Sequence, residues 1–193
     1  MNQISFIPKS KTRHGGMLTL KRRKIRRHFD IRRPIHIVLR SDLAKGSRSL
    51  VRNQKLVEDV LYKFAKRFRI RIYEKAVCGN HIHCLVKGKT RNEVQNFFRV
   101  LAGQIGQGIL RKYPLKKNEK KAHRGGIHPK SQKTFWSLLL FSRVVSWGSD
   151  FRNVRRYVIQ NALETLGIIP YQERKTRFDE KLFAAQLILV GSS

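Results

Sequence analysis

The chain has 193 residues, of which 40% are hydrophobic and 11 are Phe, so we expect one folded domain with a substantial core rather than a disordered chain. Its 43 Lys and Arg outnumber 12 Asp and Glu, which gives a formal net charge of +31 and indicates a polyanionic partner, nucleic acid before an anionic membrane surface. We expect no membrane segment, because no apolar run reaches the ~20 residues that span a bilayer. The two cysteines and the lack of a signal peptide favour a reducing, cytoplasmic location.

Basic residues gather in two segments whose composition is typical of loops. Residues 1–33 hold eleven Lys or Arg and one acid, and residues 111–133 hold nine and one acid. Both are rich in Gly, Pro, Ser, His or Asn, so the first is predicted to be a flexible arm and the second a basic insert, both suited to gripping a nucleic-acid backbone. The residues that we expect to contact nucleic acid in them are Lys21, Arg22, Arg23, Lys116, Lys117, Lys120 and Lys121.

The remaining pattern predicts strands and helices in the order β-α-β-β-α-β-α. Strand-like alternation or β-rich composition marks four stretches, two of them joined as a hairpin, at residues 34–41, 70–78, 81–88 and 134–146. Apolar residues at helical spacing follow Asn53, a candidate cap, and Thr90, whose partner Glu93 completes a capping-box pattern. The last helix is predicted over 147–167, capped by Ser149 or Asp150, with Gly167 at its C-terminal end.

This order is that of a ferredoxin-like split βαβ fold. We expect an α+β domain: a four-stranded antiparallel sheet with both main helices on one face and an extra C-terminal helix. The domain is predicted to span residues 34–168, and residues 169–193 to form a tail that either docks as a helix or joins two chains in a homodimer. Because the first and third strands are neighbours in this fold, we expect His36 to lie near His81 and His83 on the open face of the sheet.

His81 and His83 are candidate metal ligands, since histidine is a poor filler for an apolar strand. Residues at i and i+2 on one strand face lie about 7 Å apart at their Cα atoms, so their imidazoles can converge on one divalent ion. The plain alternative is a pair of half-exposed polar residues. A zinc site that adds Cys78 and Cys84 is less favoured, because adjacent strand residues point to opposite faces and Cys84 cannot join both histidines.

The last helix offers a nucleophile and a third ligand. Tyr157 and Asn161 are four residues apart and so lie on one side of the helix; the plain alternative is a tyrosine that packs its ring and exposes its hydroxyl. A phenol, with a pKa near 10, attacks phosphorus only with help. An ion held by the two histidines and the Asn161 amide oxygen would supply that help, with Gln160 as the rival ligand. Further predicted nucleic-acid contacts are His36, Arg40, Arg155 and Arg156.

Three segments in this order resemble the single-tyrosine HUH transposases, and within them the REP-associated tyrosine transposases: "RPIHIVLR", "GNHIHCLVKG" and "YVIQN". The resemblance covers roughly residues 31–168. In that family one strand carries His-hydrophobic-His, matched by His81 and His83. A later helix carries the nucleophilic tyrosine with Asn four residues on, matched by Tyr157 and Asn161.

The resemblance implies an endonuclease that nicks and rejoins single-stranded DNA with Mg²⁺ or Mn²⁺ as cofactor, beside a DNA hairpin. Attack by the tyrosine would leave a 5′-phosphotyrosine and a free 3′-hydroxyl, and another strand's 3′ end would reseal the break without ATP. The alternative function is a non-catalytic RNA-binding protein, for instance a ribosome-associated one. That alternative accounts for the charge but not for the two histidines, Tyr157 and Asn161 together. A replication-type nickase would share the chemistry and differ in its biological setting.

Overall fold

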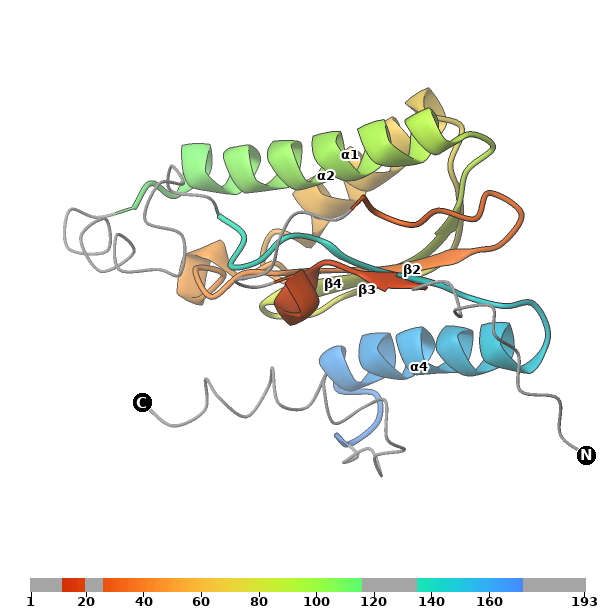
Figure 1. Cartoon of the computed structure of the whole chain (residues 1–193). Coiled ribbons are helices and arrows are strands. Elements are labelled where there is room, and N and C mark those ends of the chain that lie inside the picture. Colours follow the sequence, from red (N-terminus) through yellow and green to blue (C-terminus); the bar gives the residue numbers. More distant parts are fainter. Residues whose placement is uncertain (1–11, 20–25, 116–134, 172–193) are drawn as a thin grey trace, which may run out of the picture.

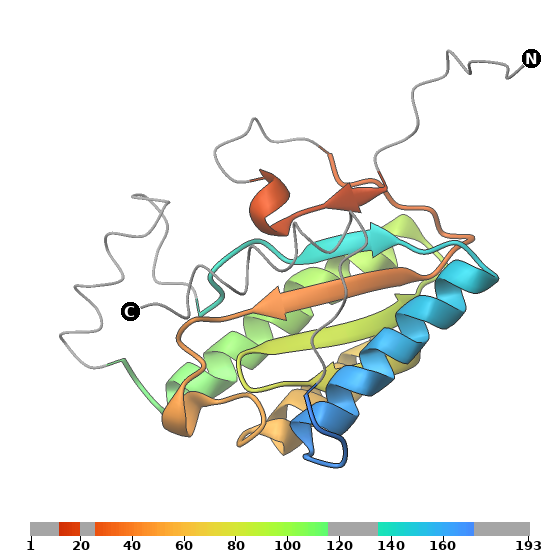
Figure 2. The ribbon, with the colours of Figure 1, turned by 90° about the horizontal axis from the view of Figure 1, so that it is seen from below.

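An antiparallel sheet of five strands, in the order β1-β5-β2-β4-β3, organises the chain (Figures 1 and 2). This computed structural model describes residues 12–19, 26–115 and 135–171. The strands are β1 (Arg13–His14), β2 (Ile35–Arg40), β3 (Arg71–Val77), β4 (His81–Lys87) and β5 (Phe141–Val144). The helices are α1 (Gln54–Arg67), α2 (Arg91–Lys112) and α4 (Ser149–Thr165), with short 3₁₀ turns at Gly16–Thr19 and Gly46–Arg48.

The α+β split βαβ fold predicted from the sequence is confirmed. The four predicted strands are β2 to β5, and β2 lies between β5 and β4, as the fold requires. One strand was not predicted: β1 pairs with the outer edge of β5, Arg13 opposite Arg143. The predicted strand over 134–146 shortens to Phe141–Val144, because Phe135 and Trp136 turn into the core, where the Trp136 indole N–H donates to the Ala102 carbonyl at 2.7 Å.

Two stretches of the segment predicted as a flexible arm are described, residues 12–19 and 26–33, and both contact the domain. Besides the β1 pairing, the Arg27 guanidinium donates to the Leu140 carbonyl at 2.8 Å and to the Ser142 hydroxyl at 2.5 Å. The seven lysines and arginines predicted to contact nucleic acid at 21–23 and 116–121 lie outside the described residues, as does the tail after residue 171.

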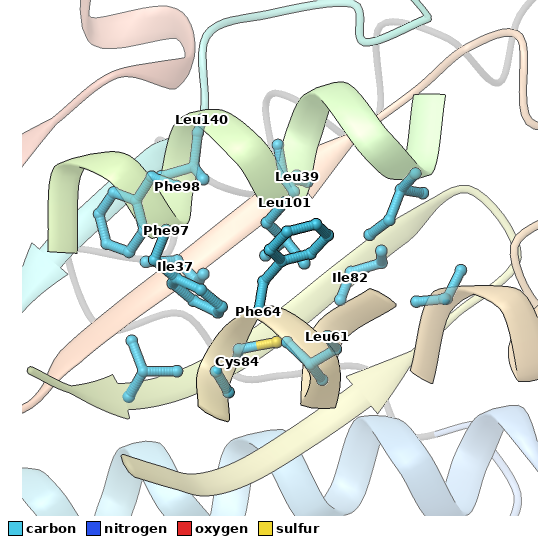
Figure 3. Close-up of a cluster of buried hydrophobic side chains, with 14 of the residues drawn as sticks. Ile37, Leu39, Leu61, Phe64, Ile82, Cys84, Phe97, Phe98, Leu101 and Leu140 are labelled. Carbon is cyan, nitrogen blue, oxygen red and sulfur yellow. The ribbon is translucent and has the colours of Figure 1, made fainter. Parts of the chain in front are cut away.

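The main hydrophobic core lies between the sheet and the layer of α1 and α2 (Figures 1 and 3). The predicted capping box holds the start of α2: the Glu93 N–H donates to Thr90 Oγ1 at 3.2 Å, and the Thr90 N–H donates to Glu93 Oε2 at 3.0 Å. Asn53 precedes α1, but its side chain does not cap the helix. Its amide instead donates to the carbonyls of Ser47 and Ser49, both at 2.8 Å, and ties down the preceding 3₁₀ turn.

Helix α4 lies on the sheet face that was predicted to be open (Figures 1 and 2). It packs over β3 and β4, where a second, smaller cluster of buried side chains comprises Ala76, Cys78, Leu85, Val145, Val154 and Val158. Gly148, with φ 90°, takes the N-cap position that Ser149 or Asp150 was expected to fill, and Gly167, with φ 71°, follows the last turn as predicted. Within the described residues, no helix is long and apolar enough to cross a membrane.

Candidate active site

The strand pairing brings the predicted histidines to one face of the sheet. In the β2–β4 register His81 lies opposite Arg40, His83 opposite Val38, and His36 opposite Leu85. Directly opposed residues share a face, and alternate residues along a strand do too. All four predicted residues therefore lie on the same face of the sheet, as expected: His36, Arg40, His81 and His83. This is the face on which α4 packs, so part of it is covered rather than open.

His81 is half-buried, and a side chain from the hairpin turn orients its ring. The Nδ1 atom of His81 lies 2.8 Å from Oδ1 of Asn80. Because an amide oxygen only accepts, Nδ1 of His81 is the donor in this contact. The imidazole of His83, which has no exposed surface, lies edge-on to that of His81 at 4.8 Å between ring centroids.

His36 is buried beneath this pair, with 5% of its surface exposed. Its Nε2 atom lies 3.2 Å from Nδ1 of His83, and the two rings are stacked at 5.4 Å with 12° between their planes. Burial, reinforced by the positive charge of Arg143 and opposed by Asp150, lowers the pKa of His36 to about 3. The ring is thus neutral at pH 7, and one of the two facing nitrogens donates while the other accepts.

Tyr157 projects from α4 onto the histidines. Its ring lies edge-on to His83 at 5.3 Å and to His36 at 6.0 Å between centroids. The salt bridge between Arg143 on β5 and Asp150 in the first turn of α4, together with the Ser146 N–H donating to Asp150 Oδ2 at 2.9 Å, ties the start of the helix to the sheet. The tyrosine and the histidine pair therefore meet within one chain.

The two predicted amide ligands differ in their surroundings. Asn161 is buried at 7% exposure, and its Nδ2 donates to the Tyr157 carbonyl at 2.7 Å, so that the amide nitrogen is engaged and the oxygen is the atom left to accept or to bind a cation. Gln160 is half-buried and its Nε2 donates to Glu164 Oε1 at 2.8 Å along the helix. Asn161 is therefore the more buried of the two amides, and its oxygen has no bond within the helix, unlike the amide of Gln160.

Cys78 lies beside the histidines as well. One potential ligand atom from each of Cys78, His81 and His83 lies within 4.8 Å of the other two. Cys84 lies on the opposite face, among the side chains under α1 and α2 (Figure 3), where burial raises the pKa of its thiol to about 12. The expectation that Cys84 cannot join both histidines is therefore correct.

Three of the arginines predicted to contact nucleic acid lie among the described residues. Arg40 is largely buried and forms an ion pair with Asp42 at 3.6 Å. Arg155 is exposed and forms an ion pair with Glu74 at 2.8 Å, which links α4 to β3, and Arg156 is exposed on the same helix. Among these described residues, Arg155 and Arg156 are exposed to solvent, whereas the buried His36 ring contacts His83 and Tyr157.

The chain was compared with protein families and with solved structures. Residues 33–161 match the family described as "Transposase IS200 like". A solved structure of a REP-associated tyrosine transposase bound to a REP hairpin aligns with a TM-score of 0.54 and 13% identity, over 81% of this chain and 94% of that one. A Deinococcus radiodurans R1 protein, itself only provisionally assigned as a transposase, aligns with a TM-score of 0.41 and 16% identity, over 72% and 97%. No curated protein matches the chain.

Proposed function

The chain belongs to the IS200-like transposase family, and we propose that it nicks and rejoins single-stranded DNA through a 5′-phosphotyrosine formed on Tyr157. The observation that carries this proposal is the contact of the Tyr157 ring with two buried histidine rings, 5.3 Å and 6.0 Å away. A tyrosine that served only to pack α4 would need neither imidazole. Trapping of a covalent protein–DNA adduct on a denaturing gel is the experiment that tests the reaction.

In the proposed cleavage, Tyr157 Oη attacks the scissile phosphorus. The Oη–P bond forms as the P–O3′ bond breaks, the phenol proton is lost, and the leaving 3′ oxygen takes up a proton, which leaves a 3′-hydroxyl and a 5′-phosphotyrosine. The covalent link conserves the phosphodiester energy, so that attack by the 3′-hydroxyl of another strand reverses the chemistry and rejoins DNA. Salt bridges of α4 to β3 and β5 hold the tyrosine against the site through both steps.

A divalent cation fits the donor atoms of this site. The potential ligand atoms of His81, His83 and Cys78 lie within 4.8 Å of one another. Because Nδ1 of His81 donates to Asn80, Nε2 is the His81 atom that we assign to the ion. We propose that the two histidines hold the ion together with a third ligand, for which Asn161 was predicted from the sequence. When bound, such an ion polarises the phosphate and offsets the charge that builds up on it during attack.

We propose DNA with a hairpin beside the cleaved strand as the partner. The related REP-associated transposase was solved bound to a REP hairpin, and the net charge of +31 here suits a phosphate backbone. The exposed Arg156 on α4 and the basic segments at 21–23 and 116–121 are the residues we assign to that contact. This assignment makes binding strongly dependent on salt, because each neutralised phosphate releases counterions.

We propose that His36 acts as a positioning residue for His83. A hydrogen bond from His83 Nδ1 to His36 Nε2 would fix the tautomer that presents Nε2 of His83 to a cation, as outer partners of metal-bound histidines do. His36→Phe, which keeps a ring but accepts no hydrogen bond, is expected to weaken Mn²⁺ binding in calorimetry by about 10–100-fold.

The matched variant is His36→Gln, whose amide oxygen can accept the same bond. Restoration of Mn²⁺ affinity by Gln but not by Phe, at equal thermal midpoints, separates positioning from packing. Equal affinity in the wild type and in His36→Phe would contradict the role.

Because Tyr157 lies on the histidines of its own chain, we expect each active site to be complete within one chain. Mixing a His81→Ala protein with a Tyr157→Phe protein should give no covalent adduct with DNA on a denaturing gel. If the tyrosine were exchanged between two chains, the mixture would contain sites with an intact pair and would regain adduct. Recovery of adduct to a quarter or more of the wild-type amount would contradict the single-chain site.

A further inference from the structure

Cys78 occupies a fixed position across the hairpin from the first histidine. It follows β3, and its N–H donates to the carbonyl of His81 at 2.9 Å, which closes the turn through Gly79 and Asn80. Residues that face each other across such a pair project to the same side of the sheet. Cys78 is 6% exposed and packs in the cluster under α4, the side on which His81 and His83 also lie.

We propose that Cys78 Sγ is the third protein ligand of the metal, so that the site is a His₂Cys centre that prefers thiophilic divalent ions such as Zn²⁺ or Co²⁺. The inference rests on the proposed function in taking His81 and His83 as the other two ligands. It differs in the metal class, because an amide oxygen as third ligand suits Mg²⁺ or Mn²⁺, whereas a thiolate favours Zn²⁺ and Co²⁺ over both.

The distances support three-point coordination. With Zn–S near 2.3 Å and Zn–N near 2.0 Å, tetrahedral ligands lie about 3.5 Å from one another. The three donor atoms already lie within 4.8 Å of each other before any ion draws them in, so rotations of side chains on a fixed hairpin close the gap of about 1 Å. Coordination releases the thiol proton to solvent and leaves a thiolate bound to the ion.

Coordination by Cys78 would also leave one position of the metal open for the DNA phosphate. Three protein ligands and one open position are the pattern of catalytic zinc sites, in which the fourth position receives water or substrate. A scissile phosphate oxygen would take that position beside Tyr157. Asn161, whose amide nitrogen is bound to the Tyr157 carbonyl, would then orient the helix or the phosphate rather than complete the metal shell.

The test is a Co²⁺ titration of the metal-free full chain, followed by absorption spectroscopy. The wild type is expected to develop the visible bands of tetrahedral Co²⁺ together with a thiolate-to-cobalt charge-transfer band in the near ultraviolet. Cys78→Ser should lose the charge-transfer band and bind Co²⁺ at least about tenfold more weakly, since even loss of an outer partner costs that much. Cys84→Ser is the matched control: it removes the other buried thiol, on the far face of the sheet, and should leave the spectrum unchanged.

The outcomes separate this inference from the proposed function. Visible bands that vanish in His81→Ala, with no charge-transfer band in the wild type, would overturn Cys78 as a ligand while the histidine site stands. A charge-transfer band that persists in Cys78→Ser would also overturn it. Binding of no divalent ion in the wild type would overturn both. Circular dichroism on each variant confirms that a lost band does not report a lost fold.

Discussion

Tyr157→Phe is expected to abolish the covalent adduct with single-stranded DNA while leaving DNA binding unchanged. Only the phenol oxygen is removed, and the ring that packs edge-on against His83 and His36 remains. Without the nucleophile no covalent bond to DNA can form at this position, so the amount of adduct should fall below about one-thousandth of the wild-type amount. The measurement is a denaturing gel of labelled hairpin-flanked DNA with protein and Mn²⁺, beside a binding isotherm at two salt concentrations.

Tyr62→Phe is the matched control for this result. Tyr62 lies half-exposed on α1, on the opposite side of the sheet from α4, and should form wild-type amounts of adduct. If Tyr157→Phe formed adduct at the wild-type rate, Tyr157 would not be the nucleophile. Tight, salt-sensitive binding with no adduct from either the wild type or the variants, across several DNA sequences, would instead favour a non-catalytic nucleic-acid-binding protein.

The sheet and the α1–α2 layer were predictable because local pattern and tertiary environment agree there. Ile35, Ile37 and Leu39 alternate toward the core, and Thr90 with Glu93 marks the start of α2 through a contact entirely within one turn. The Asn53 side chain was not predictable in the same way. Asparagine can bind backbone on either side of it, and here the preceding turn, rather than the helix, supplies the acceptors.

The placement of α4 and β1 could not be predicted from pattern. The apolar stripe of α4 shows that one side of the helix is buried, but it does not identify the surface that buries it. The alternation along β2 predicted that His36 and Val38 would lie on an open face, yet both side chains are buried. β1 has two residues, too short for any periodicity, and exists because the edge of β5 offers unpaired backbone groups.

Within the candidate site, the resemblance to the tyrosine transposases, rather than any periodicity, implied that Tyr157 would lie near His81 and His83, and the structure brings the three rings together. The strand order predicted that His36 would lie near His83, and the structure places their ring nitrogens 3.2 Å apart. The burial of His36 was missed, because this face was expected to be open. Cys78 was set aside along with Cys84, although one signal distinguishes them. Across a two-residue turn Cys78 is paired with His81 and shares its face, while Cys84, next to His83 on one strand, cannot.

The second large effect is expected at His81, whose replacement by Ala should remove the divalent-ion dependence of cleavage and nearly all adduct. His81 is the better histidine to change, because it is half-buried, whereas His83 is fully buried and its loss would leave a cavity against Tyr157 and His36. Loss of one of two imidazole ligands should lower adduct formation at least about 100-fold and weaken ion binding in calorimetry to a similar degree.

The matched control is His28→Ala, at an exposed position in the segment that precedes β2. Both variants lose one imidazole from a strongly basic chain, so salt-dependent DNA binding should stay at the wild-type level in each. Cleavage should then separate them: His28→Ala should form adduct with Mn²⁺ and lose it with EDTA, as the wild type is expected to do. His81→Ala should give the EDTA result under both conditions. Wild-type adduct from His81→Ala with Mn²⁺ would show that the ion needed for cleavage does not depend on this histidine, and the proposed centre would have to be abandoned.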